Sequence, residues 1–311
     1  MPDIVKDKVA VVTGSGMGIG RGEAIGLAAQ GAKVVVNART REAVDKVVKE
    51  IRKSGGVAVA NYDSVASIEG ADRIVRTAID NFGRIDILVN NAGGPQQMGP
   101  VFDINPEIWD EVVKVNLSGT FYCTHYAVKQ MKQQGYGRII NTSSHNGLGE
   151  VGNCDYSAAK EGVVGFTRSV ARELAEYGIT CNAIRPCANT GQMDNPVAQQ
   201  MLKNALGEGA MEFVHLLQEY YTPEGVAPLV VYLASEYADN VNGCVFEVYT
   251  GHVALYPDPQ KVEQVLWKNG HWLAEELVDI MPKTLVQGRV RSLPPILPGP
   301  LGDYIRGKGQ T

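Results

Sequence analysis

Short, continuously apolar runs alternate with longer amphipathic stretches along most of this 311-residue chain. Runs such as Val9–Val12 and Ile87–Val89 lack the polar alternation of a half-exposed strand, which indicates strands buried on both faces. The stretches between them are long enough for helices that connect parallel strands. We expect strands at 9–12, 34–36, 57–60, 87–89, 138–140, 179–184 and 245–248, and helices at 42–53, 68–81, 106–134 and 156–177. This order predicts an α/β fold with a doubly wound, mostly parallel sheet of seven strands.

Two regions depart from this alternation. Residues 190–222 follow the sixth predicted strand and are apolar and rich in methionine, so we expect an adaptable helical lid over a binding site. Residues 252–311 follow the last predicted strand and end in a proline-rich stretch. We therefore expect a main domain at 1–251 and a C-terminal extension at 252–311 that is not an independent domain.

Composition and charge exclude several classes of protein. The net charge of −5 offers no field that would attract a polyanion, so we expect no nucleic-acid partner. No uncharged apolar run approaches the roughly 18 residues of a membrane span, and the charged first residues are unlike a signal peptide. The five cysteines form no Cys-x-x-Cys pair, so we expect free thiols and no metal site. These features predict a cytoplasmic protein without a membrane span.

A glycine-rich turn follows the first predicted strand directly. The sequence from Thr13 to Gly20 leads into the apolar-periodic start of a helix. Glycine lets the backbone turn tightly and approach a ligand, and the free N–H groups of a helix N-terminus stabilise a pyrophosphate. We therefore expect a dinucleotide to be bound by Gly14, Ser15, Gly16, Met17, Gly18, Ile19 and Gly20.

The spacing of these glycines, T-G-x-x-x-G-x-G, resembles the short-chain dehydrogenase/reductase family, classical type. Four further motifs stand in the order found in that family: Asn90-Asn91-Ala92-Gly93, Asn116, Ser143-Ser144, and Tyr156 four residues before Lys160. The resemblance covers residues 5–250 and implies a Rossmann fold that binds NAD(P)(H). It also implies that Asn116, Ser144, Tyr156 and Lys160 are catalytic, with Lys160 holding the nicotinamide ribose and Asn116 supporting a chain of waters.

These residue types suit acid–base chemistry independently of the family resemblance. Tyr156 and Lys160 are four residues apart, so both project from one face of a helix. A phenol has a pKa near 10, and an adjacent ammonium favours the phenolate, which would make Tyr156 usable near neutral pH. Ser144 would donate a hydrogen bond to the substrate oxygen as negative charge develops. Ser143, which keeps the family's commonest distance to Tyr156, is the alternative.

The end of the second predicted strand bears on the choice of cofactor. An acidic residue there would bind the ribose hydroxyls of NAD, but residues 37–41 read Asn-Ala-Arg-Thr-Arg. Arg39 and Arg41 could bind the 2′-phosphate of NADP, so we favour NADP(H), with NAD(H) as the alternative. Cys187 departs from the family, which usually has glycine at this position. By resemblance, the other cofactor-binding residues are Asp63, Ser64, Asn90, Ala92, Gly93, Tyr156, Lys160, Pro186 and Thr190.

These observations predict an oxidoreductase that interconverts a secondary alcohol and a ketone, and the apolar lid favours a hydrophobic substrate. A 3-hydroxyacyl-CoA substrate is an alternative, because the extension resembles tails on bacterial relatives of peroxisomal multifunctional β-oxidation enzymes. Alternatives of other classes are a catalytically silent nucleotide-binding subunit and an enzyme that uses Tyr156 for epimerisation or elimination. The resemblance further implies a homodimer or homotetramer, in which we expect residues 265–300 to cover the partner.

Overall fold

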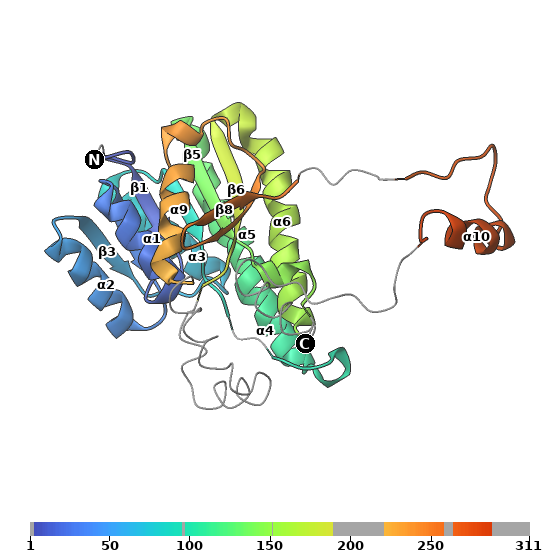
Figure 1. The fold of residues 1–311 in the computed structure, drawn as a ribbon. Coiled ribbons are helices and arrows are strands. Elements are labelled where there is room, and N and C mark those ends of the chain that lie inside the picture. The colour runs from blue at the N-terminus through green and yellow to red at the C-terminus, as the bar shows by residue number, and fades with distance from the viewer. Residues whose placement is uncertain (1–2, 95–96, 151, 189–220, 258–263, 288–311) are drawn as a thin grey trace. The chain divides into compact units, whose positions relative to one another are not determined.

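The computed structural model describes residues 3–94, 97–150, 152–188, 221–257 and 264–287 (Figure 1). The chain divides into a main unit that contains Met1–Tyr256 and a small unit within Pro257–Pro295. The described residues of the small unit contain one short α-helix, α10 (Ala274–Ile280). Most of the predicted lid at 190–222 lies outside the described residues. Among the described residues, every helix is too short or too polar to cross a membrane.

The main unit is built on one sheet, which has eight strands within the described residues, in the order β3-β2-β1-β4-β5-β6-β7-β8. Strands β1 to β7 run parallel, and β8 is antiparallel to β7. This is the doubly wound α/β fold that the sequence predicts. The strands are β1 (Val9–Val12), β2 (Lys33–Asn37), β3 (Val57–Asn61), β4 (Ile87–Asn90), β5 (Gly137–Thr142), β6 (Ile179–Pro186), β7 (Val245–Tyr249) and β8 (His252–Leu255).

The eighth strand is the one element of the sheet that the sequence analysis missed. Its residues were assigned to the C-terminal extension, yet they pair with β7, for example Ala254 with Glu247. Gly251 adopts a left-handed conformation with φ of +74°, which lets the chain reverse between the two strands. The sheet therefore continues to Leu255.

Helices cover both faces of the sheet (Figure 1). One apolar core joins the sheet to α1, α2 and α9, and a second joins it to α3, α5 and α6. Local signals set several helix ends: the Ser67 hydroxyl caps α3 and the Asn105 side chain caps α4. The helices of the main unit are α1 (Gly18–Ala29), α2 (Arg41–Lys53), α3 (Ile68–Phe82), α4 (Pro106–Val113), α5 (Gly119–Gln134), α6 (Cys154–Leu174) and α9 (Ala227–Leu233). Short helices lie at Val101–Asp103, His145–Leu148, Ala175–Tyr177, Pro223–Val226 and Glu236–Ala238, and at Met281–Lys283 in the small unit.

The single helix predicted at 106–134 is divided in the structure. Between α4 and α5 the backbone forms a π-helical turn, Lys114–Ser118. A wider turn of this kind changes the direction of the side chains inside an otherwise continuous helix and often marks a functional site. Asn116 lies at its centre and is fully buried.

Charged groups buried at the amino ends of the strands are paired. Asp86 precedes β4 and accepts hydrogen bonds from the backbone N–H of Val9 at 2.9 Å and from Arg84 at 2.6 Å. Arg138, near the start of β5, donates to Asp239 at 2.9 Å. Its remaining bonds go to the carbonyls of Gly137, Gly178 and Ser235. These bonds connect the ends of neighbouring strands.

Candidate functional site

A cleft of about 460 Å³ lies at the opposite edge of the sheet, where β1, β4, β5 and β6 end. In open parallel sheets this carboxyl edge is where ligands bind. Nine of the nineteen predicted site residues line it, among them Ser144, Tyr156 and Lys160. The cleft is lined by Met17, Gly18, Ile19, Gly20, Asn91, Gly93, Gly94, Thr142, Ser143, Ser144, His145, Asn146, Tyr156, Lys160, Pro186, Cys187 and Ala188.

The glycine turn forms one wall of this cleft, and its geometry requires glycine. Gly14 has a φ of +65°, and a Cβ atom placed on it would lie 2.7 Å from the Cα of Ala92. A Cβ atom on Gly20 would lie 2.7 Å from the carbonyl oxygen of Gly14. Asn91 holds the turn in place, because its side-chain amide donates to the carbonyls of Thr13 and Gly14. Glycine at these two positions therefore lets the turn pack closely against Ala92 and against the start of α1.

The start of α1 suits a pyrophosphate. Met17 caps this helix without a side-chain hydrogen bond, so the first N–H groups of the helix have no side-chain acceptor there. The Ser15 hydroxyl donates to the carbonyl of Val12 at 2.7 Å and accepts from the N–H of Asn37 at 3.0 Å. Ser15 is fully buried, so its side chain joins β1 to β2 and does not face the cleft.

Tyr156 and Lys160 lie one turn apart on α6. The Lys160 ammonium is 5.5 Å from the centroid of the Tyr156 ring and donates to the carbonyl of Thr142 at 2.8 Å. Burial lowers the pKa of Lys160 to about 8. Burial also raises the pKa of Tyr156, and a hydrogen bond with the Ser144 side chain acts in the opposite direction. The hydrogen bond with Ser144 therefore favours the phenolate, and the further effect that the sequence argument assigns to Lys160 stays a prediction.

The two adjacent serines face different neighbours. The Ser143 hydroxyl donates to the backbone carbonyl of Lys160 at 2.8 Å and is almost fully buried. The Ser144 hydroxyl accepts from the N–H of Asn146 at 3.2 Å and lies within hydrogen-bonding reach of Tyr156. Of the two serine hydroxyls, that of Ser144 is therefore the one that lies close to the Tyr156 hydroxyl.

Asn116 occupies the π-helical turn beside the cleft. Its side-chain amide donates to the carbonyl of Val112 at 2.9 Å. Its carbonyl oxygen is buried and has no hydrogen-bond partner in the described part of the chain. A Cβ atom on Gly93, which lines the cleft, would be 3.4 Å from that oxygen. An unpartnered acceptor in this position suits an ordered water.

The region beyond β2 carries no carboxylate directed at a ribose. The Asn37 side chain is buried and donates to Asn61 at 2.8 Å and to the carbonyl of Asp63 at 2.9 Å. The Asp63 carboxylate accepts from Arg73 at 2.7 Å. Arg39 is exposed and forms no ion pair or hydrogen bond among the described residues.

Three other residues considered for the cofactor, Arg41, Ser64 and Asn90, are engaged in local contacts. The Arg41 guanidinium stacks 4.1 Å from the centroid of the Tyr62 ring. The Ser64 hydroxyl accepts from the N–H of Ala66 at 3.2 Å. Asn90 points into the protein interior and donates to Thr124 and Asn141. Arg39 therefore has the least constrained side chain among the candidates for a 2′-phosphate.

Cys187 and Pro186 line the cleft at the end of β6. Burial, with a smaller effect of the nearby Glu247 carboxylate, raises the pKa of Cys187 to about 12. Its thiol therefore stays protonated at neutral pH and is a poor nucleophile. The predicted cofactor residue Thr190 lies outside the described residues.

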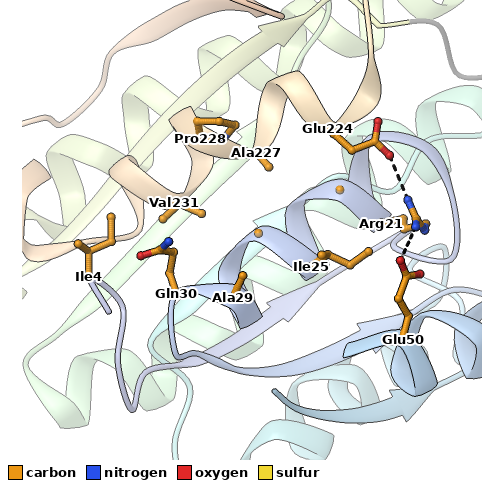
Figure 2. A pocket seen from close by; sticks show the side chains of 12 residues that line it. Ile4, Arg21, Ile25, Ala29, Gln30, Glu50, Glu224, Ala227, Pro228 and Val231 are labelled. Atoms are coloured by element: carbon orange, nitrogen blue, oxygen red, sulfur yellow. Dashed lines mark hydrogen bonds and ion pairs between the residues drawn. The ribbon is translucent and has the colours of Figure 1, made fainter. Parts of the chain in front are cut away.

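A second cavity, of about 710 Å³, lies between α1 and α9 and contains none of the motif residues (Figure 2). Its walls are mainly apolar, with Ile25 from α1 and Val231 from α9. Arg21 closes one end by ion pairs to Glu50 at 2.6 Å and to Glu224 at 3.0 Å. Despite its size, it carries no arrangement suited to acid–base chemistry.

Comparison with known proteins indicates the same family as the motifs that line the cleft. The family model described as short chain dehydrogenase matches residues 8–202. The chain belongs to the short-chain dehydrogenase/reductase family. The protein is therefore an NAD(P)-dependent oxidoreductase of this family.

Relatives within the short-chain dehydrogenase/reductase family differ in architecture. The chain is 42% identical over 249 residues to a 3-oxoacyl-[acyl-carrier-protein] reductase of Synechocystis sp., covering 79% of this chain and 97% of the relative. It is 41% identical over 256 residues to the peroxisomal multifunctional enzyme type 2 of Mus musculus, covering 79% of this chain but 32% of that enzyme. The chain thus matches one part of a much longer protein in the second case.

Solved structures of the family share the fold. A short chain dehydrogenase from Mycobacterium avium is 35% identical with a TM-score of 0.79, and the match covers 95% of this chain and 100% of that one. Levodione reductase is 32% identical with a TM-score of 0.70, covering 79% of this chain and 97% of that one. The similarity therefore extends over the whole dehydrogenase fold.

Sequence reasoning did not assign several residues that line the cleft. Asn91 belongs to the motif Asn90-Asn91-Ala92-Gly93, and its three neighbours in that motif were assigned to the cofactor. Asn91 itself was not assigned, although its side chain holds the glycine turn. Thr142 supplies the carbonyl acceptor for Lys160, a backbone role that side-chain patterns do not reveal. Its place at the carboxyl end of a strand was the available signal.

Proposed function

We propose that this protein reduces a hydrophobic ketone, or oxidises the corresponding secondary alcohol, with NADP(H) as the cofactor. The observation that carries the proposal is the meeting of Tyr156, Lys160 and Ser144 beside a glycine turn that is open to a dinucleotide. When bound, the nicotinamide supplies or accepts the hydride. The protein side chains provide the proton and stabilise the charge on oxygen.

Tyr156 would be the general acid and base. In reduction its hydroxyl donates a proton to the carbonyl oxygen, and in oxidation the phenolate removes the proton of the alcohol. Ser144 donates a hydrogen bond to the same oxygen as negative charge develops. We favour Ser144 over Ser143 because the Ser143 hydroxyl is already bonded to the backbone of α6.

Lys160 and Asn116 would support this proton transfer. The Lys160 ammonium has one hydrogen-bond acceptor among the described residues, the carbonyl of Thr142, which leaves two N–H donors for the ribose hydroxyls of a cofactor. The buried oxygen of Asn116 offers an acceptor for a water that could connect the cleft to solvent. The role of Lys160 depends on its two remaining N–H donors, and the role of Asn116 depends on its side-chain oxygen. These groups have no hydrogen-bond partner among the described residues.

The preference for NADP(H) rests on the polar groups beyond β2. The Asn37 side chain is bonded within the protein, Asp63 is paired with Arg73, and Arg39 has no such partner among the described residues. We expect Arg39→Ala to weaken NADPH binding by about 10- to 100-fold and to leave NADH binding nearly unchanged, because a charge-assisted bond to the 2′-phosphate is lost. Fluorescence titration of both cofactors measures this.

A matched control for the cofactor experiment is Arg76→Ala. Arg76 is 66% exposed and paired with Asp72 within α3, so its loss should leave both affinities unchanged. Equal weakening of NADPH and NADH by Arg39→Ala, or tighter binding of NADH by the unmodified protein, would contradict the NADP(H) preference.

A 3-oxoacyl thioester is a second candidate substrate, because one relative is named a 3-oxoacyl-[acyl-carrier-protein] reductase. Absorbance at 340 nm with NADPH, tested against apolar ketones, hydrophilic ketones and 3-oxoacyl-CoA esters, separates these classes. Faster turnover of apolar ketones supports the proposal, and faster turnover of the thioesters supports the alternative. A complete lack of turnover with every ketone and alcohol would favour a silent subunit or another reaction of Tyr156.

We also propose a homodimer or homotetramer. Large apolar side chains are exposed on neighbouring elements of the main unit: Phe102 is 82% exposed before α4, and Phe121 on α5 is 47% exposed. Exposed apolar groups of this size are typical of interfaces between protein chains. Light scattering of the purified protein measures its mass.

A further inference from the structure

A cluster of polar side chains lies behind the Ser144–His145 turn, on the side away from the cleft. Arg185 of β6 and Glu247 of β7 are register partners on neighbouring parallel strands. Tyr256 directly follows β8, the strand that pairs with β7. None of these three residues lines the cleft, whereas Ser144 and His145 both do.

Arg185 is bonded to the backbone of Ser144. One terminal nitrogen of its guanidinium donates to the Ser144 carbonyl at 2.8 Å, and the other donates to Glu161 at 2.7 Å. The Arg185 side chain is 4% exposed and Glu161 is 45% exposed, so of these two bonds the one to the Ser144 carbonyl is the more shielded from water. A Cβ atom on Gly147 would lie 2.8 Å from the guanidinium, which shows that the turn leaves room for it.

Glu247 and Tyr256 are close to the side chain of His145. The Nδ1 atom of His145 is 3.4 Å from a Glu247 carboxylate oxygen and 3.4 Å from the Tyr256 hydroxyl. Tyr256 donates to the same carboxylate oxygen at 2.7 Å, and Nε2 of His252 lies 3.0 Å from the other. Burial and the bond to Glu247 raise the pKa of Tyr256, so its hydroxyl keeps its proton.

We propose that Arg185, Glu247 and Tyr256 are positioning residues that fix the Ser144 hydroxyl relative to Tyr156. The inference rests on the proposed function of Ser144. Arg185 of β6 holds the turn at the carbonyl of Ser144, and Glu247 of β7 with Tyr256, which follows β8, holds it at the ring of His145. The Ser144 hydroxyl, on the residue whose carbonyl is held, is then directed toward the phenol by groups that never touch the substrate.

Two measurable consequences follow from this arrangement. Displacement of a reacting group by about 1 Å can lower a rate by up to about 10²-fold. In addition, the Ser144 bond opposes the effect of burial on the pKa of Tyr156, so a loosened Ser144 lets that pKa rise. The other titratable side chains that line the described part of the cleft are Lys160, His145 and Cys187.

The test uses Tyr256→Phe in the full-length protein. This change removes the hydroxyl and keeps the ring, whose centroid lies 5.3 Å from the Arg185 guanidinium. We expect kcat for alcohol oxidation to fall about 10-fold and its pH profile to move to higher pH, with the Kd for NADPH unchanged. Tyr237→Phe is the matched control, because Tyr237 is 70% exposed and should show neither effect.

Arg185 provides a second variant pair with graded outcomes. Arg185→Met should lower kcat by about 10²-fold, and Arg185→Lys, which keeps one donor for the Ser144 carbonyl, should recover part of that loss. A lower melting temperature with unchanged kcat and pH profile in Tyr256→Phe and Arg185→Met would overturn the positioning role.

A parallel Ser144→Ala variant separates this proposal from the proposed function. If Ser144→Ala is inactive while Tyr256→Phe and Arg185→Met behave as the unmodified enzyme, the positioning role fails and the role of Ser144 stands. If Ser144→Ala keeps full activity, the role of Ser144 is wrong, and the positioning proposal falls with it.

Discussion

Two buried cations, one at each edge of the sheet, are bonded differently, and only the one at the carboxyl edge lines the cleft. Arg138 at the amino edge and Lys160 at the carboxyl edge are both 2% exposed. Arg138 is bonded to the Asp239 carboxylate and to three backbone carbonyls. Lys160 is bonded to a single carbonyl, that of Thr142, and burial lowers its pKa to about 8. Equal burial therefore accompanies full pairing of Arg138 and sparse pairing of Lys160, whereas Arg185, the other buried cation at the carboxyl edge, is paired with Glu161 outside the cleft.

The difference indicates which edge is built for stability and which for a ligand. A buried charge without its partners costs stability, so a fold keeps one only where another function requires it. The carboxyl edge also contains the unpartnered buried oxygen of Asn116. Arg138 and Asp86 at the amino edge join strand ends through their bonds.

Among the changes that test the contrast between the two cations, Lys160→Met has the largest expected effect. We expect Lys160→Met to lower kcat by at least about 10²-fold, because the proton transfer loses the ammonium that supports it. The melting temperature should stay the same or rise, because a poorly paired buried cation is replaced by an apolar side chain of similar length. Steady-state kinetics and a thermal melt of the same sample measure both. A large fall in melting temperature would mean that Lys160 is a structural group like Arg138.

Arg138→Met should show the reverse pattern. We expect the free energy of unfolding to fall by about 2–4 kcal/mol, because several bonds at the amino edge lose their donor. The kcat per folded molecule should stay unchanged, since Arg138 lies at the edge away from the cleft. Urea unfolding monitored by circular dichroism provides the measurement, with Arg76→Met as the exposed control. An activity loss without destabilisation would remove the contrast between the edges.

The smallest effect is a pH dependence at Glu23, a fully buried residue of α1. Neither of its carboxyl oxygens has a partner in the described part of the chain, and burial raises its pKa from 4.5 to about 8. The folded protein then binds this proton more tightly than the unfolded chain, so its stability falls as the pH rises from 4.5 to about 8.

Glu23→Gln should remove that dependence. We expect the variant to gain about 1–3 kcal/mol over the unmodified protein between pH 5 and pH 8, with no further gain above pH 8. Melting temperatures of both proteins across this range decide the matter. A constant difference at every pH would show that Glu23 is not the group that titrates.

Much of the main unit could be predicted because its signals are local. All seven predicted strands are confirmed. A continuously apolar run of strand length is typical of a strand that is buried on both faces. Gly14 and Gly20 stand where a Cβ atom would overlap neighbouring protein backbone, so the fold itself requires glycine there, and their binding of a dinucleotide stays a prediction. β8 was missed because its four residues give a weak signal and follow the previous strand after a two-residue turn.

The groups behind the cleft could not be predicted. Arg185 and Glu247 come from two neighbouring strands and Tyr256 follows a third, so the register of the sheet brings them to the Ser144–His145 turn. The π-helical turn at Asn116 could likewise not be predicted, because the amphipathic pattern of residues 106–134 is that of one continuous helix. The cytoplasmic location and the oligomeric state stay predictions.

The central claim is that Tyr156 transfers the proton in hydride exchange at the carboxyl edge. The most direct test is the kcat of Tyr156→Phe, followed at 340 nm with the ketone that the unmodified enzyme reduces fastest, alongside a titration of NADPH. The account predicts at least about a 10³-fold loss of kcat with an unchanged Kd for NADPH, because water is then the only proton donor. Retention of more than a tenth of the activity would contradict it.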